Sequence, residues 1–241
     1  GYDNQPHYTP DGSALLYTSE RNGQTDIYRW PLADDRPHPL TTTGTSEYSP
    51  TPLSDSTFAV VRVEDDGAQR LWQFSMHAEG PDTVEALLLP EVEPVGYFAM
   101  ADTTDWALFV LGEPPTLQWV SRREDARAVV VRRDIGRSIQ SLPHAPGVSI
   151  VQRYSGAPDS LVVVRSPDDT HTYAPVLQGD GDHAWTQAGY LLMTSGTALY
   201  QWHSSKDAWR EVYDWAPATP SRIAVSPTGG QMAVVVTRRA P

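Results

Sequence analysis

The sequence predicts an all-β fold, a β-propeller of four-stranded antiparallel blades, and three observations lead to it. The 21 Pro and 17 Gly residues interrupt the chain too often for an amphipathic helix. Short runs rich in Val, Leu, Tyr and Trp alternate with turn residues, which is typical of short strands. These runs recur about every 40 to 45 residues, the usual length of one propeller blade.

The first repeat shows the order of its strands most clearly. We expect its four strands near residues 5–9, 13–19, 26–30 and 39–41. Pro10 presets φ and Gly12 accepts a positive φ, so the turn between the first two strands is expected to be tight. The dipeptide Asn22-Gly23 favours a two-residue hairpin between the second and third strands.

The turn and the third strand recur in register along the chain. Copies of the turn fall at residues 53–56, 102–104, 145–147, 187–189 and 226–229. The third strand recurs as pairs of apolar residues two positions apart, namely Tyr28/Trp30, Trp72/Phe74, Leu117/Trp119, Val162/Val164 and Tyr200/Trp202. Because successive side chains alternate between the faces of a strand, the two members of a pair face the same side. A β-sandwich has no reason to repeat its turns in register, so we prefer the propeller.

The 241 residues fit a single propeller domain. We expect its blades at about 5–44, 45–92, 93–136, 137–179, 180–217 and 218–241. The last unit shows only two strands, so we expect six blades, of which the sixth is incomplete in this chain. Because a long unpaired edge favours aggregation, we also expect further residues, N-terminal ones in the first instance, to supply the missing strands. The alternative is five blades with an accessory hairpin.

The residues of the first repeat follow a known sequence pattern. They run Pro6-His7-Tyr8-Thr9-Pro10-Asp11-Gly12, then Ser19-Glu20-Arg21-Asn22-Gly23, then Ile27-Tyr28. This repeat resembles that of the TolB-like β-propeller family, with its WD-like Pro-Asp-Gly turn. Ser226-Pro227-Thr228-Gly229 keeps part of the pattern, and the middle copies are degenerate. The resemblance implies a fold more than an activity.

The family resemblance also has implications for cellular location and for function. TolB is periplasmic, so the resemblance implies a periplasmic or cell-surface location. TolB has a separate N-terminal α/β domain, and no such domain is visible in this sequence. Similar repeats occur as non-catalytic domains of peptidases and in polysaccharide lyases, some of which depend on a metal.

Composition and charge restrict the possible partners. The formal net charge of −12 disfavours binding to nucleic acid or to anionic lipid. The absence of Cys excludes disulfides, thiolate metal sites and thiol nucleophiles. No run approaches the roughly 20 apolar residues that a membrane-spanning helix needs, so we predict no membrane span.

The candidate binding residues are three histidines and one tryptophan, His7, His144, His183 and Trp185. All four fall on or near first strands, which line the channel of a propeller, so the imidazoles could converge on a metal. Their spacing contains no local ligand motif, and we therefore favour separate roles and predict no metal and no cofactor. The acidic stretch Gly179-Asp180-Gly181-Asp182-His183 looks like part of a calcium loop, but we interpret it as a solvated turn.

Two functions fit these observations. Serine-hydrolase, zinc-protease, phosphate-loop and dinucleotide motifs are all missing, so we predict no catalytic residue. The preferred function is a non-enzymatic scaffold that binds a protein or peptide partner. The alternative is a carbohydrate-active enzyme, a metal-dependent lyase or a hydrolase, that binds a glycan in the channel.

Overall fold

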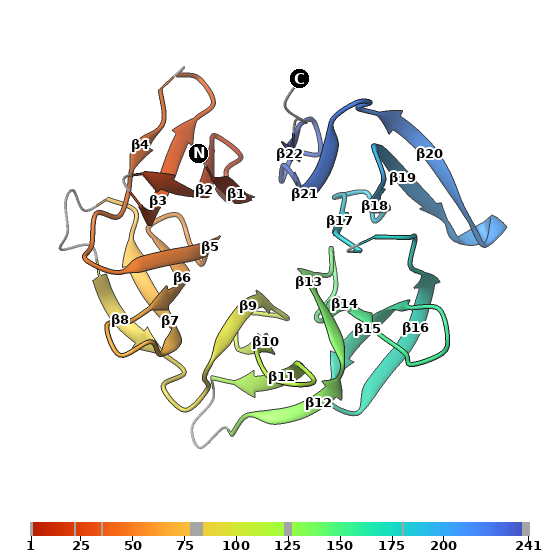
Figure 1. The fold of residues 1–241 in the computed structure, drawn as a ribbon, viewed down its shortest axis with the longest axis horizontal. Coiled ribbons are helices and arrows are strands. Elements are labelled where there is room, and N and C mark those ends of the chain that lie inside the picture. The colour runs from red at the N-terminus through yellow and green to blue at the C-terminus, as the bar shows by residue number, and fades with distance from the viewer. Residues whose placement is uncertain are drawn as a thin grey trace. The chain divides into compact units, whose positions relative to one another are not determined.

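The computed structural model describes residues 2–21, 23–34, 36–77, 84–122, 127–179 and 181–237, with the side chains of residues 84 and 85 left out. The described chain forms five four-stranded sheets and one two-stranded sheet (Figure 1). Apart from strands it contains one short 3-10 helix, η2 (Ser204–Lys206). No helix among these residues has the length and apolar character needed to cross a bilayer.

Each sheet is built from strands that follow one another in the sequence. Sheet 1 contains β1 (Asp3–Tyr8), β2 (Ala14–Arg21), β3 (Gln24–Pro31) and β4 (His38–Pro39). Sheet 2 contains β5 (Ser46–Pro52), β6 (Thr57–Val63), β7 (Gln69–Ser75) and β8 (Val84–Leu88). Sheet 3 contains β9 (Val95–Met100), β10 (Asp105–Val110), β11 (Thr116–Ser121) and β12 (Val129–Arg133).

The remaining sheets follow the same order. Sheet 4 contains β13 (Ile135–Ser141), β14 (Val148–Gln152), β15 (Ser160–Ser166) and β16 (Asp169–Pro175). Sheet 5 contains β17 (His183–Trp185), β18 (Leu191–Ser195), β19 (Ala198–His203) and β20 (Ala208–Asp214). Sheet 6 contains only β21 (Thr219–Val225) and β22 (Met232–Thr237). These sheets confirm the predicted propeller fold, with five complete blades and an incomplete last one.

Local turn chemistry sets the strand order. Arg21 pairs with Gln24, so β2 and β3 are joined by the predicted two-residue hairpin. Gly23 adopts φ +83°, as such a turn requires, whereas Asn22 lies outside the described residues. The fourth strand of sheet 1 is shorter than predicted and starts one residue earlier, at His38.

The turn between the first and second strands carries the clearest structural repeat. In five of the six sheets a side-chain oxygen at this corner accepts a backbone N–H at or just before the start of the second strand; the oxygens belong to Thr9, Ser54, Asp102, Thr186 and Ser226. In sheet 4 the corner residue is Leu142, which has no such oxygen; its backbone N–H donates to the carbonyl oxygen of Gly147, a backbone bond that the other corners also make.

The chain divides into two compact units, Gly1–Val95 with Ala224–Val235, and Gly96–Ile223 with Val236–Pro241. In the first unit, apolar side chains of sheets 1 and 2 share one core, in which Ile27 packs with Phe58 and Phe74. In the second unit, one core lies between sheets 3 and 4 and another between sheets 4 and 5. Burial of these faces accounts for the aromatic and β-branched residues of the second and third strands.

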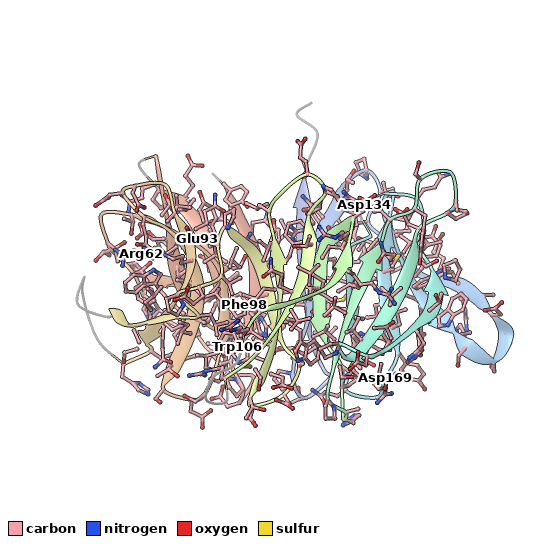
Figure 2. All side chains as sticks on the ribbon, turned by 90° about the horizontal axis from the view of Figure 1, so that it is seen from below. Arg62, Glu93, Phe98, Trp106, Asp134 and Asp169 are labelled. Carbon is pink, nitrogen blue, oxygen red and sulfur yellow. The ribbon has the colours of Figure 1, made fainter. Side chains whose placement is uncertain are left out.

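Aromatic pairs reinforce the sheets from within. Phe98 on β9 stacks on Trp106 on β10 with ring centroids 5.6 Å apart and planes 9° from parallel (Figure 2). The guanidinium of Arg122 lies over the Trp106 ring, 5.2 Å from its centroid. Such aromatic and cation–π contacts stabilise the fold in addition to the burial of apolar area.

Candidate functional site

The four candidate residues lie at different depths. His7 is exposed on β1, and His144 is exposed in the turn between β13 and β14. His183 is buried at the start of β17, with 1% of its surface exposed. Trp185 ends the same three-residue strand and is half-buried. His7 belongs to the first compact unit and the other three residues to the second.

A closed hydrogen-bond network surrounds the His183 ring. Its Nδ1 lies 2.9 Å from Ser138 Oγ and 3.2 Å from the carbonyl oxygen of Gly181. Its Nε2 lies 2.8 Å from Ser149 Oγ. A carbonyl oxygen only accepts, so Nδ1 carries the proton and Nε2 accepts from the Ser149 hydroxyl. Both ring nitrogens are therefore engaged inside the protein.

The same network explains the position of Trp185. Its indole Nε1 donates to Ser149 Oγ at 2.8 Å, so Ser149 accepts from Trp185 while it donates to His183. The indole meets Tyr173 edge-on, with centroids 5.2 Å apart. It also packs against the core between sheets 4 and 5. Trp185 thus joins two blades instead of standing free at a surface.

Burial determines the charge of His183. Removal from water lowers the pKa of the ring to about 4, although the hydrogen bonds to Gly181 and Ser149 act in the opposite direction. The ring is consequently neutral near pH 7, and the tautomer with the proton on Nδ1 satisfies every hydrogen bond described. This arrangement holds β17 against β13 and β14.

A second polar cluster adjoins the first. Asp182, which is 4% exposed, accepts a hydrogen bond on Oδ1 from Arg222 on β21. Its Oδ2 lies 3.4 Å from Nη2 of Arg137 on β13. Arg222 also donates to the hydroxyl of Tyr97 on β9 at 3.2 Å and lies 5.5 Å from the centroid of that ring. The cluster joins strands of sheets 3, 4 and 6 to the residue just before β17 of sheet 5.

The interpretation of residues 179–183 as a solvated turn is wrong for Asp182. Its carboxylate is buried and paired with the guanidinium groups of Arg137 and Arg222. A carboxylate loses its hydration on burial, and paired cations offset that loss. Asp180, the other acid of the calcium-like stretch, lies outside the described residues.

The structure describes no metal-binding group of side chains. Within the described ranges, no three His, Asp or Glu side chains are grouped so that they could hold a metal ion. The Nε2 atom of His144 is bound to the carbonyl oxygen of Gln187. The assignment of His7, His144, His183 and Trp185 as binding residues stays a prediction.

Sequence reasoning missed most members of these clusters, namely Arg137, Ser138, Ser149 and Arg222. The repeat spacing contains a signal that could have found two of them. Ser138 lies 45 residues before His183, and Arg137 lies 45 residues before Asp182. This separation is close to the 44 or 45 residues between the third strands of the earlier blades, although the third strands of these two blades, marked by Val162 and Tyr200, lie 38 residues apart. A separation of about one repeat indicates that first strands of neighbouring blades contact each other.

Comparison with known proteins shows the fold and no closer relationship. No protein-family model and no curated protein matches the sequence. Among solved structures, TolB from Acinetobacter baumannii matches with a TM-score of 0.69 and 13% identity, over 88% of this chain and 55% of TolB. The chain therefore spans about half of the TolB protein.

Two enzymes match over more of their length. A gluconolactonase from Xanthomonas campestris matches with a TM-score of 0.73 and 10% identity, over 98% of this chain and 83% of the enzyme. An oligogalacturonate lyase from Vibrio parahaemolyticus matches with a TM-score of 0.57 and 12% identity, over 96% and 88%. At such low identity the likeness extends to the fold alone. The chain is a β-propeller protein, similar in structure to TolB and to these enzymes.

Proposed function

We propose that the chain is a non-enzymatic scaffold that binds a protein or peptide partner in the periplasm or cell envelope. One observation carries the proposal: the buried polar side chains around His183 and Asp182 satisfy one another across the edge strands of several sheets. The location rests on the likeness to TolB, whose propeller this chain resembles.

The state of His183 supports binding over catalysis. A general base must reach the proton that it removes and needs a pKa near the working pH. The Nε2 lone pair of His183 already accepts a hydrogen bond, the ring is enclosed, and its pKa lies near 4. A network of this kind instead fixes the backbone around it, and a rigid surface loses little conformational entropy when a partner binds.

A paired measurement tests the proposal. The purified chain is immobilised, an envelope extract of the source organism is passed over it, and any retained protein is purified and titrated back. We expect saturable binding with a defined stoichiometry. Retention that does not reproduce with purified material would contradict the proposal.

The second arm measures catalysis with the same preparation. Oligogalacturonides with and without Mn²⁺ and an aldonolactone represent the reactions of the similar enzymes. We expect no turnover above the uncatalysed rate. Turnover that is lost in His7→Ala or His144→Ala, both exposed positions, would establish the carbohydrate-active alternative instead.

A further inference from the structure

The guanidinium of Arg137 is the most accessible charged group of the cluster around Asp182. The Arg137 side chain is 37% exposed, whereas the side chains of Arg222 and Asp182 are 14% and 6% exposed. Arg222 already supplies a cation to Asp182, on Oδ1, and the charge of one guanidinium balances that of one buried carboxylate. Neutralisation of Asp182 therefore does not by itself account for the second arginine.

Charge on the first strands of sheets 3 to 6 is confined to this cluster. The strands β9, β13, β17 and β21 have the sequences VGYFAM, IGRSIQS, HAW and TPSRIAV. Arg137 and Arg222 are the only residues of these four strands that are charged near pH 7, because His183 is neutral. Taken with Asp182, which directly precedes β17, the strands carry one positive charge more than negative charges, in a chain of net charge −12.

Close packing holds the backbone next to Arg137 and Asp182. Gly136 and Gly181 precede these two residues, and both lie against Val151. A Cβ built on either glycine would come within 2.9 Å of a side-chain atom of that valine. The residues that follow the pair belong to the histidine network described above. The guanidinium therefore projects from a rigid base, and a group that is fixed before binding loses little entropy when it binds.

We infer that the Arg137 guanidinium binds a carboxylate on an otherwise neutral peptide segment of the partner, an assignment that rests on the proposed binding function and adds the chemistry of the ligand. A planar guanidinium fits the two oxygens of a carboxylate or a phosphate. A phosphate ester carries close to two negative charges near pH 7, whereas the surplus on these strands is one positive charge. The net charge of −12 also repels a polyanionic segment at long range.

Capped pentapeptides test the site directly. One peptide has a central glutamate between alanines, and its control has glutamine in place of the glutamate. Each is titrated to millimolar concentration into the isotope-labelled chain, and the side-chain Nε–H signals of the arginines are recorded. We expect the glutamate peptide to shift the Arg137 signal saturably, and the glutamine peptide to bind at least fivefold more weakly.

Substitutions at Arg137 separate charge from geometry. Arg137→Gln removes the charge, so we expect at least fivefold weaker binding of the glutamate peptide. Arg137→Lys keeps the charge that Asp182 faces but loses the planar fork, so it should fold like the parent and still bind more weakly than the parent. Arg165→Gln, at an exposed position of β15, changes the net charge by the same amount. It is the matched control and should bind like the parent.

Three results would overturn the inference. The first is equal binding of the glutamate and glutamine peptides, or no shift of the Arg137 signal at millimolar peptide. The second is unchanged affinity of both folded Arg137 variants. The third is tighter binding of trigalacturonate than of the glutamate peptide at Arg137, because the carboxylate would then belong to a glycan. If a partner purified on the immobilised chain binds Arg137→Gln as it binds the parent, the scaffold function survives and only this site fails.

Discussion

Burial moves the pKa values of two enclosed side chains, His183 and Glu47, in opposite directions, and it favours the neutral form of both. His183 is kept neutral because its charged form would lose hydration. Glu47 on β5 has no exposed surface, and burial raises the pKa of its carboxyl. Hydroxyls of Thr43 and Thr45 donate to Glu47 Oε1, and Arg62 Nε lies 3.7 Å from the same oxygen.

His183 should make the protein sensitive to mild acid. Its pKa is lower in the folded chain than in the unfolded chain, so its contribution is fully present above pH 6.5 and is lost as the pH falls towards 4. The shift corresponds to about 3 kcal/mol. Urea titrations at several pH values should show that the parent loses more stability over this range than His183→Gln. Parallel curves for the two proteins would contradict the assignment.

Glu47 should have the opposite pH dependence. A raised folded pKa means that its contribution is present below the unfolded pKa, near 4.5, and is lost as the pH rises. Relative to the parent, Glu47→Gln should become more stable as the pH rises from 4 to 8, because the neutral amide does not have to ionise in the buried site. Melting curves of both proteins at several pH values measure this trend. A difference that stays constant with pH would show that the Arg62 pair offsets the effect of burial.

The Ser149 hydroxyl is hydrogen-bonded to both His183 and Trp185. Removing it should lower the unfolding free energy more than a substitution at the surface does. Ser149→Ala leaves the Trp185 N–H and the His183 Nε2 without their hydroxyl partner in a buried site. We expect a loss of about 1–3 kcal/mol in unfolding free energy. Ser155→Ala, at an exposed turn position, is the control and should change stability by less than about 0.5 kcal/mol. Equal effects of both substitutions would mean that the network contributes nothing.

At the scale of the element, the corner of sheet 4 depends on a single glycine. Gly147 adopts φ +123°, and a Cβ there would lie 2.7 Å from the carbonyl oxygen of Val164 and 3.1 Å from Arg165 Cα. Backbone atoms cannot move aside as a flexible side chain can. The same corner carries Leu142 in the place of the Ser, Thr or Asp found at the other corners.

Two alanine substitutions distinguish the cost of a steric clash from the cost of a positive φ. Gly156 also has a positive φ, +83°, but nothing lies within 4 Å of a Cβ built there. Gly156→Ala should cost about 1 kcal/mol, the usual penalty for the left-handed region. Gly147→Ala should cost at least about 3 kcal/mol, because it adds a backbone clash. Chemical denaturation of both variants measures the difference, and similar values would show that the corner relaxes.

The sequence predicted elements better than it predicted contacts. Turn residues and apolar pairs located every third strand, since both features act within a few residues. The fourth strand of sheet 1 was misplaced by one residue, because β4 is only two residues long and carries almost no pattern. The cluster of Asp182, Arg137 and Arg222 was missed because its members come from separate blades and meet only after folding.

At the scale of the whole molecule, the net charge of −12 should make stability depend on salt. Like charges repel more strongly in the compact state than in the expanded chain, and salt screens this repulsion. The melting temperature should rise by a few degrees between 10 mM and 500 mM NaCl and level off above that. A fall over this range would show that attractive ion pairs, such as those of Asp182, outweigh the general repulsion.

The corner between the first two strands has a consequence for how such chains can be found. At five of the six corners a side-chain oxygen accepts a backbone N–H, and Thr, Ser and Asp each supply it at one corner or another. Substitutions among these residue types can therefore change the sequence of a repeat while its bend is kept. Searches for distant members should score this hydroxyl-or-carboxylate position and the spacing between corners, and give little weight to any fixed tripeptide.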